Sequence, residues 1–401
     1  MSREVIGKPL WKFMEACLNV GLIHNRYQIR GGEDIVVENE MALLRDYSNL
    51  VRTYLVDSCE LKGFVGALRA AVSMCYSFRG RRIVREWLRS SSLDLVHVHN
   101  TFPLISPSVF DALQAEEVPF VYTLHNFRTI CPTSLLMLEG KACERSIRES
   151  AFWAVPKKVY RNSLLGTALV ACLVELHKQR GTWLFEGGRF ICLTEFAKGK
   201  FVEAGFPCER ISVKPNFSID YGFDPSERRE NSALFVGRLS PEKGFNVALK
   251  AWGHIDFPLK VVGPGSVPAD IPSSVELLGE KSHPEVIEMI KNCAFVVVPS
   301  LCYEGFPMAI VEAFSCGVPV LCSRLGSMAE VVDDGVTGLH FEAGDPIDLA
   351  EKVQWMLDNP NERRSMGENA RKEYLEKYTP EKNYEMLMDI YQAAIEESGK
   401  R

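Results

Sequence analysis

Short apolar segments rich in β-branched residues alternate with helix-like patterns along the whole chain. Seven of these segments have the length of a strand and few polar interruptions, which is typical of strands buried on both faces of a parallel sheet. They are residues 94–99, 119–125, 189–194, 233–238, 258–263, 293–299 and 319–323. Because helical patterns separate them, the alternation predicts α/β sheets with helices on both faces.

A break in this alternation divides the chain. Residues 214–231 contain turn formers and charges without periodicity, and a new strand pattern begins at Ala233. We therefore predict two doubly wound, Rossmann-like domains, residues 1–215 and 216–384, and a C-terminal helix at about 385–401 that packs back on the first. Ligands of such sheets bind at the carboxyl ends of the strands, so two facing domains predict an interdomain cleft.

The composition is that of an ordinary globular enzyme. Hydrophobic residues make up 46% of the 401 residues and charged residues 24%, which excludes disordered and collagen-like classes. No apolar run reaches the roughly 18 to 20 residues that cross a bilayer, and charges interrupt the first twenty residues, so neither a membrane span nor a secretory signal is expected. The 12 cysteines include no Cys-x-x-Cys pair. We expect a cytoplasmic protein without a cysteine-rich zinc site.

Charge is divided unevenly between the halves. Residues 1–220 carry 28 basic and 23 acidic side chains, whereas residues 221–401 carry 18 and 29. A basic half suits anionic lipid or polyphosphate, although uneven charge on a solvated surface is the simpler interpretation. Within the basic half, residues 164–176 form an apolar run with basic flanks that is too short to span a membrane. A helix lying among lipid headgroups and a buried core helix both fit this pattern.

The strongest chemical signal lies in residues 299–319. Pro307 suits the first turn of a helix and Gly317 the position just past its end, so a helix is predicted from about Pro307 to Cys316. The free backbone N–H groups and the positive dipole end at its N-terminus suit a phosphate. The residues expected to bind it are Gly305, Phe306, Pro307 and Met308.

Two carboxylates accompany this helix. Glu304 precedes it and Glu312 lies eight residues later, a little over two turns, so both are expected on one side, where they can accept hydrogen bonds from sugar hydroxyls. The alternative is that Glu304 is a surface turn residue and Glu312 an ion-pair partner. Glu312 has apolar neighbours in the sequence, and burying it with neither a ligand nor a partner is costly.

A second signal follows the strand predicted at 233–238. Arg238 and Lys243 lie five residues apart in a loop that ends at Gly244. Two cations in a strand-to-helix loop at the carboxyl end of a sheet can neutralise a diphosphate.

Together these stretches closely resemble the C-terminal domain of retaining glycosyltransferases with the GT-B fold, specifically glycosyltransferase family 4. The family's Glu-x7-Glu motif corresponds to Glu304 and Glu312, and its Arg/Lys pair to Arg238 and Lys243. The resemblance covers roughly residues 18–385.

The first half resembles the same family. Residues 23–33 match its strand and glycine loop, in which Gly31 and Gly32 let backbone N–H groups approach the donor phosphates. His125 matches the family's active-site histidine. His97 and His99 match a His-x-His of the family, although a packed side chain is the simpler interpretation of His97.

Two departures from the family pattern stand out. Residues 1–17 precede its usual start. Relatives often carry further cysteines after the positions of Cys131 and Cys143, where this chain has Ser146 and Val159, so a metal role there is not implied.

The resemblance implies a reaction in which a nucleoside diphosphate sugar, bound mainly by the second domain, donates a hexose with retention of configuration. Arg238, Lys243, the Gly31-Gly32 loop and the N–H groups around residues 305–308 would stabilise the leaving diphosphate. Glu304 would orient the donor sugar, Glu312 would bind the ribose, and His125 would position the sugar. The chain has no Asp-x-Asp, so no metal or other cofactor is expected.

The acceptor is less defined. Residues 99–110 resemble bacterial family members that build cell-surface polysaccharides, including lipopolysaccharide, which implies a glycan or polyprenyl-diphosphate-linked acceptor and peripheral contact with the anionic inner face of the membrane. The alternatives are a nucleotide-sugar epimerase of the same architecture and a catalytically silent scaffold protein. Nucleic-acid binding is not supported, because the chain is acidic overall and has no basic stripe with interleaved aromatics.

Overall fold

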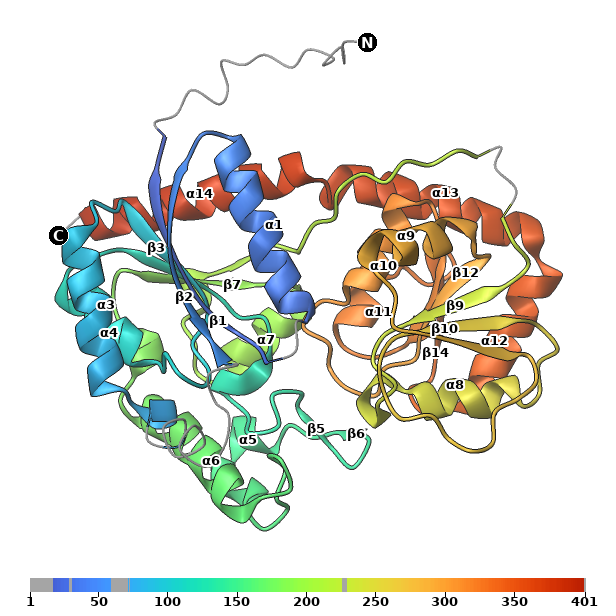
Figure 1. Ribbon diagram of the computed structural model, residues 1–401, viewed down its shortest axis with the longest axis horizontal. Helices are drawn as coiled ribbons and strands as arrows, with labels where there is room; N and C mark the ends of the chain where they lie inside the picture. The colour runs from blue at the N-terminus through green and yellow to red at the C-terminus, as the bar shows by residue number, and fades with distance from the viewer. Residues whose placement is uncertain (1–16, 29–30, 59–70, 72, 226–228, 400–401) are drawn as a thin grey trace.

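The computed structural model describes residues 17–28, 31–58, 71, 73–225 and 229–399 (Figure 1). It contains two α/β lobes, joined by a linker and by the last two helices. The expectations for residues 1–16 lie outside the described residues.

The first lobe is built on a six-stranded parallel sheet in the order β2-β1-β3-β4-β7-β8. Its strands are β1 (Asn19–Arg26), β2 (Leu50–Asp57), β3 (Leu95–Asn100), β4 (Phe120–Thr123), β7 (Gly188–Cys192) and β8 (Ile211–Val213). One face packs on α3 (Phe78–Ser90), α4 (Ser108–Ala115) and α7 (Glu195–Glu203), and the other on α1 (Gly32–Asp46) and α14 (Pro380–Gly399). A small hairpin, β5 (Met137–Leu138) and β6 (Lys141–Ala142), and the short α5 (Arg145–Arg148) extend from this lobe.

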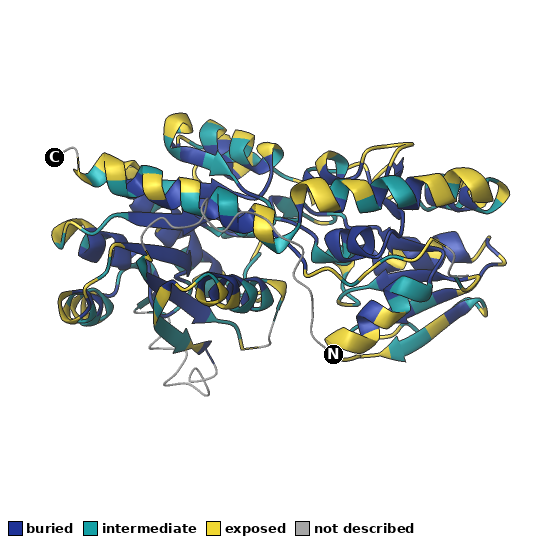
Figure 2. Ribbon diagram, turned by 90° about the horizontal axis from the view of Figure 1, so that it is seen from above, coloured by how far each residue is buried: buried dark blue, intermediate teal, exposed yellow. Residues whose placement is uncertain are grey.

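The second lobe repeats this architecture with a parallel sheet in the order β11-β10-β9-β12-β13-β14. Its strands are β9 (Ala233–Val236), β10 (Leu259–Val262), β11 (Val275–Gly279), β12 (Phe295–Val298), β13 (Val320–Ser323) and β14 (Gly338–Phe341). One face packs on α9 (His283–Asn292), α10 (Met308–Ser315), α11 (Ser327–Val331) and α13 (Pro360–Lys377), and the other on α8 (Phe245–Trp252) and α12 (Pro346–Asp358). Buried residues follow both sheets, and exposed residues mark the outer sides of the helices (Figure 2).

The predicted fold class is confirmed, and all seven predicted strands are present. The helix predicted from Pro307 to Cys316 is α10, which begins and ends one residue inside those limits. The strands that the pattern did not indicate include β2, whose residues are mostly half-buried or exposed at the sheet edge. A strand of this kind lacks the continuous apolar run of a buried one.

The final helix returns to the first lobe. After α13 has packed on the second lobe, α14 begins at Pro380 and places Tyr384, Leu387 and Tyr391 in an apolar cluster with residues of β1, β3, β4 and β7. The chain therefore passes between the lobes twice, once in the linker and once between α13 and α14.

The carboxyl edges of the two sheets face each other. Thr194, just after β7, has its hydroxyl oxygen 3.0 Å from that of Ser327, which follows β13. The backbone N–H groups of Glu195 and Phe196 donate to the Glu330 carboxylate at 2.8 and 2.7 Å. That carboxylate lies at the N-terminus of α7, where a negative charge is stabilised. The strand ends that hold ligands in doubly wound sheets are thus brought together.

The apolar run at 164–176 lies in α6 (Leu164–Gln179). Val170, Ala171 and Leu173 are buried in a local core, whereas Leu164 and Leu165 are 51% and 72% exposed at the start of the helix. One face of α6 is therefore part of a core, while its first turn exposes apolar side chains. Among the described helices, none has the length and hydropathy to cross a membrane.

A buried ion pair lies where both segments that pass between the lobes meet the first lobe. The Lys214 ammonium lies 3.1 Å from Glu40 Oε2 in α1 and donates to Asn383 Oδ1 in α14 at 2.8 Å. Lys214 and Glu40 are each about 2% exposed. Burial alone would raise the pKa of Glu40, but Lys214 and His97 hold it well below its usual value.

Replacing Lys214 with Met should lower the free energy of unfolding by about 3 to 5 kcal/mol, because the substitution leaves the Glu40 charge buried without its partner. Denaturant unfolding measures this loss. Lys178→Met, at an exposed position of α6, is the control and should change stability by less than about 0.5 kcal/mol. Adding Glu40→Gln to Lys214→Met should restore part of the lost stability. If Lys214→Met and Lys178→Met were equally stable, the ion pair would not have this role.

Candidate active site

Lys243 and Glu304 form the centre of the site in the second lobe. Lys243 ends a 3-10 turn after β9, and its ammonium lies 2.7 and 2.9 Å from the two carboxylate oxygens of Glu304, which follows β12. Ser300 donates a further hydrogen bond to Glu304 at 2.6 Å. Burial alone would raise the pKa of Glu304, but the ion pair and the Ser300 hydrogen bond hold it below its ordinary value. Glu304 is thus an ionised acceptor, and the alternative of an unpaired surface turn residue does not hold.

Arg238 lies beside this pair but outside it. Its side chain is 64% exposed and forms an ion pair with Glu242 at 3.2 Å. A guanidinium in this state can exchange a weak surface contact for a ligand phosphate at small cost.

The first turn of α10 completes the second lobe's contribution. Pro307 is the N-cap residue and makes no side-chain capping hydrogen bond, so the helix begins without a side-chain partner for its first N–H groups. Phe306 is buried in the core of this lobe. Met308, the first helical residue, lies only partly buried next to that core.

Glu312 already has a partner. It is 8% exposed in α10, and its Oε1 lies 2.8 Å from Nε2 of His283, the first residue of α9. Glu312 is therefore buried with a partner, as in the alternative interpretation, and that partner comes from 29 residues earlier in the chain. His283 is 43% exposed, so the pair lies at the surface of the site.

The glycine pair of the first lobe provides space. Gly31 is the N-cap of α1, and Gly32 is its first residue. A Cβ atom at either position would meet nothing within 4 Å, and Gly31 has an ordinary extended backbone with a φ of -120°. The pair therefore leaves space at the start of α1 without a left-handed turn, although the Gly31 N–H already donates to the Asp34 carboxylate at 2.9 Å.

The loops of the two lobes touch at His125. A Cβ atom on Gly305 would lie 2.0 Å from the carbonyl oxygen of His125, so only glycine permits this contact. Tyr303, two residues before Gly305, donates a hydrogen bond across the lobes to Glu144 at 2.9 Å. The residue next to the Lys243–Glu304 pair therefore rests directly on the loop that carries His125.

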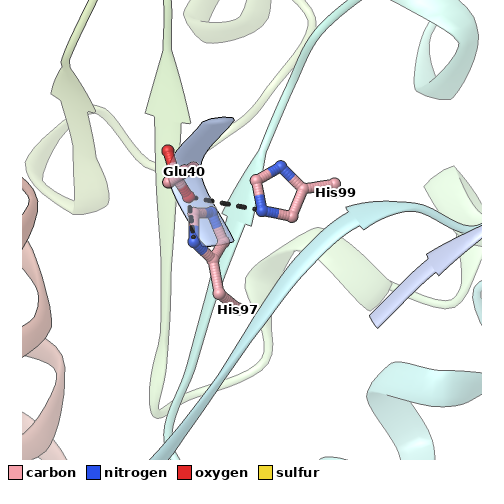
Figure 3. A group of neighbouring side chains, drawn as sticks. All are labelled: Glu40, His97 and His99. Carbon is pink, nitrogen blue, oxygen red and sulfur yellow. Dashed lines mark ion pairs between the residues drawn. The ribbon is translucent and has the colours of Figure 1, made fainter. Parts of the chain in front are cut away.

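A buried network holds the His125 ring. His125 Nε2 lies 3.0 Å from His99 Nδ1, and the two rings stack. His99 Nε2 faces Glu40 Oε1 at 3.4 Å, as Figure 3 shows. A proton on His99 Nε2 is favoured because it faces a carboxylate, which leaves His99 Nδ1 to accept from His125 Nε2–H. Burial first, and neighbouring histidines second, lower the pKa of His99 to about 3 and that of His125 well below its usual value, so both rings are neutral at pH 7.

The same carboxylate contacts His97, and the three residues have the spacing of a metal site. Ligand atoms of Glu40, His97 and His99 lie within 4.8 Å of one another. Both nitrogens of His97 already have close partners, the hydroxyls of Tyr391 and Thr123, each at 2.7 Å. Because the Lys214 ammonium already neutralises Glu40 from its other oxygen, a divalent cation would add an uncompensated buried charge. We interpret this group as a hydrogen-bond network, with His97 as the packed residue expected from its position.

A site residue that the sequence did not indicate is Glu33, directly after Gly32. Tyr27 donates to its Oε2 at 2.8 Å and Asn126, next to His125, at 3.4 Å. Its Oε1 is buried without a hydrogen-bond partner among the described residues. Burial raises the pKa of Glu33 to about 8. A glutamate beside a glycine pair was visible in the sequence, but a Tyr27 contact from across the loop was not.

Comparisons with known proteins agree with this geometry. The sequence profile of the family "Glycosyl transferases group 1" matches residues 223–373, which hold the Lys243–Glu304 pair and α10. A glycosyltransferase of Methanocaldococcus jannaschii is 28% identical over 383 residues, 91% of this chain and 95% of that protein. These similarities support a glycosyltransferase of the group 1 type.

Two further proteins are similar to this chain. D-rhamnosyltransferase WbpZ of Pseudomonas aeruginosa is 26% identical over 156 residues, 36% of this chain and 41% of that protein. The crystal structure of Anabaena Alr3699/HepE in complex with UDP aligns with a TM-score of 0.64 over 94% of this chain and 100% of that one, at 16% identity. This similarity shows the two-domain GT-B fold.

Replacing Gly305 with Ala should separate the two loops, because its Cβ atom would overlap the His125 carbonyl. We expect a loss of about 1 to 3 kcal/mol in the free energy of unfolding and at least a tenfold lower transfer rate. Gly199→Ala in α7, where a Cβ atom meets nothing within 4 Å, is the control and should be neutral or slightly stabilising. Wild-type transfer by folded Gly305→Ala would show that the contact is dispensable.

The raised pKa of Glu33 predicts a pH-dependent stability difference. Between an unfolded pKa near 4.5 and a folded pKa of about 8, the unfolded chain releases a proton that the folded chain retains, so the native state loses stability as pH rises. Glu33→Gln should lack this loss, and its advantage over wild type should grow from pH 4 to pH 8 by up to roughly 5 kcal/mol, at about 1.4 kcal/mol per pKa unit. Denaturant unfolding of both proteins at several pH values tests this, and a constant difference would rule it out.

Proposed function

We propose that this glycosyltransferase transfers a hexose-type sugar from a uridine diphosphate sugar to a glycan or polyprenyl-diphosphate-linked acceptor, with retention of configuration and without a metal ion. We further propose that it acts in surface polysaccharide synthesis, in the cytoplasm and peripherally on the inner face of the membrane. The observation that carries the proposal is the contact of Gly305 with His125, because it joins the Lys243–Glu304 pair to the loop of the opposite lobe.

The leaving diphosphate would be stabilised from both lobes. Arg238 and Lys243 supply positive charge, and the N-terminus of α10 supplies backbone N–H groups and a dipole. The open approach over Gly31 and Gly32 adds the N-terminus of α1. Charge neutralisation by fixed cations and N–H groups performs the task that a divalent metal performs elsewhere, which is the reason for proposing metal independence.

Carboxylates and His125 would bind the sugar parts of the donor. Ionised Glu304 accepts hydrogen bonds from hydroxyls of the transferred hexose, and Glu312 accepts from the ribose. With its Nε2 proton donated to His99, the neutral His125 ring can accept from a sugar hydroxyl through Nδ1. The bound UDP of the Anabaena structure supports uridine as the base, and the rhamnosyl transfer named for the Pseudomonas relative supports a six-carbon sugar.

Membrane contact is proposed for the first lobe. The exposed Leu164 and Leu165 follow Lys157, Lys158 and Arg161 at the start of α6. Apolar side chains beside basic ones suit an anionic bilayer surface.

Thermal unfolding in EDTA with uridine, guanosine and adenosine diphosphate sugars tests the donor assignment. A donor at 100 times its dissociation constant should stabilise the wild type by about 2.7 kcal/mol. Arg238→Ala should lose most of this stabilisation, because it removes a phosphate contact, whereas the control Arg82→Ala in α3, 75% exposed, should keep it. Stabilisation that appears only with added Mg²⁺ would refute metal independence, and none with any donor would refute the donor site. An isomerised sugar without a transfer product would identify an epimerase.

A further inference from the structure

Arg128 lies in the first lobe, in the 3-10 turn that follows His125 and Asn126. Its guanidinium carbon lies 5.0 Å from the centre of the Phe102 ring and 5.6 Å from that of Tyr160. One of its amino groups donates to the carbonyl oxygen of Pro132. The rings and the carbonyl fix the direction of the guanidinium, which leaves its remaining N–H groups for another partner.

The charge of Arg128 has no counter-ion within the described part of the chain. No carboxylate there forms an ion pair with it, and the ionisable neighbours that oppose the lowering of its pKa by burial are Tyr27, Tyr160 and Cys131. A second guanidinium, that of Arg161, lies 5.5 Å from the same Tyr160 ring and is likewise without an ion pair among the described residues. Burial makes the unpaired charge of Arg128 costly, and the exposed Arg161 adds positive charge beside it.

An independent observation comes from the neighbouring residue. Thr129 is 6% exposed, and its hydroxyl oxygen is buried with no hydrogen-bond partner among the described residues. Arg128 and Thr129 line one small pocket together with His125 and Asn126. A buried hydroxyl without a partner is unfavourable. A ligand that accepts hydrogen bonds would satisfy both the Thr129 hydroxyl and the remaining N–H groups of Arg128.

We propose that this pocket binds a phosphoryl group of the acceptor, with Arg128 and Thr129 as its ligands. This inference rests on the proposed glycosyl transfer, and it defines the acceptor as a phosphorylated one. The pocket is small, and polar side chains of Asn126, Arg128 and Thr129 line it. Its position beside His125 puts the phosphoryl group next to the reacting sugar.

The phosphoryl group can belong to a soluble sugar phosphate or to a lipid phosphate. Leu164 and Leu165, exposed at the start of α6, come directly after Arg161 and Ser163 in the chain, so an apolar chain attached to a bound phosphate has a surface to lie on. Binding of a lipid phosphate should therefore depend on these leucines, whereas binding of a soluble sugar phosphate should not.

Isothermal titration with glucose 1-phosphate and with farnesyl phosphate tests the site, in the presence of a saturating nucleoside diphosphate that blocks the donor phosphates. We expect wild type to bind at least one probe and Arg128→Gln to bind it at least tenfold more weakly. Arg148→Gln, 73% exposed in α5, is the matched control and should bind as wild type does. Leu164→Ser with Leu165→Ser should weaken only farnesyl phosphate if the acceptor is a lipid.

Thr129→Val separates this proposal from a purely structural role. Because the hydroxyl has no partner, Val should leave the fold equally or more stable, yet the proposal expects severalfold weaker phosphate binding. The proposal is overturned if wild type binds neither probe, or if folded Arg128→Gln and Thr129→Val both bind as wild type does. If no nucleoside diphosphate stabilises the protein, the proposed donor site is wrong. The phosphate titrations, repeated without nucleotide, then still test whether this pocket binds phosphate.

Discussion

A single buried carboxylate, that of Glu40, connects the parts of the structure on which the site depends. One oxygen holds Lys214, where the chain leaves the first lobe, and Lys214 in turn holds Asn383, where the chain returns in α14. The other oxygen faces His97 and His99, and His99 holds the His125 ring. The ion pair that fixes both crossings between the lobes thus also orients the residue at the point where the lobes meet. Such a pair tolerates no missing member, since each of its charges is buried.

The second constraint is that the two sheets present their carboxyl edges to each other. Each domain on its own would offer one set of strand-end loops, which is sufficient to bind a nucleotide. Contact between Gly305 and the His125 carbonyl brings both sets within reach of one ligand. Among the polar contacts between the lobes, Tyr303 and Glu144 are half-buried, whereas Thr194 and Ser327 are buried.

The sequence predicts local chemistry here better than distant partners. Lys243 and Glu304 were found from loop position and motif spacing, and the buried strands from their apolar runs, because both signals lie within a few neighbouring residues. Lys214 and Glu40 are 174 residues apart, and no local pattern pairs them. His283, the partner of Glu312, belongs to another helix, and no local pattern marks it. What the sequence could not predict is which polar groups the fold brings together inside the protein, and these contacts decide the charge state of each site residue.

Charge state also explains why a histidine suits the meeting point. Transfer of a sugar builds positive charge on its anomeric carbon and negative charge on the leaving diphosphate. In the proposed reaction, the cations of Arg238 and Lys243 would stabilise the diphosphate, but a cation beside the sugar ring would oppose the transfer. His125 is kept neutral by burial and by neighbouring histidines, so it can hold a sugar hydroxyl without placing a positive charge there. The buried network of Glu40, His97 and His99 therefore contributes in two ways. It fixes the orientation of the His125 ring, and its histidines help to keep that ring neutral.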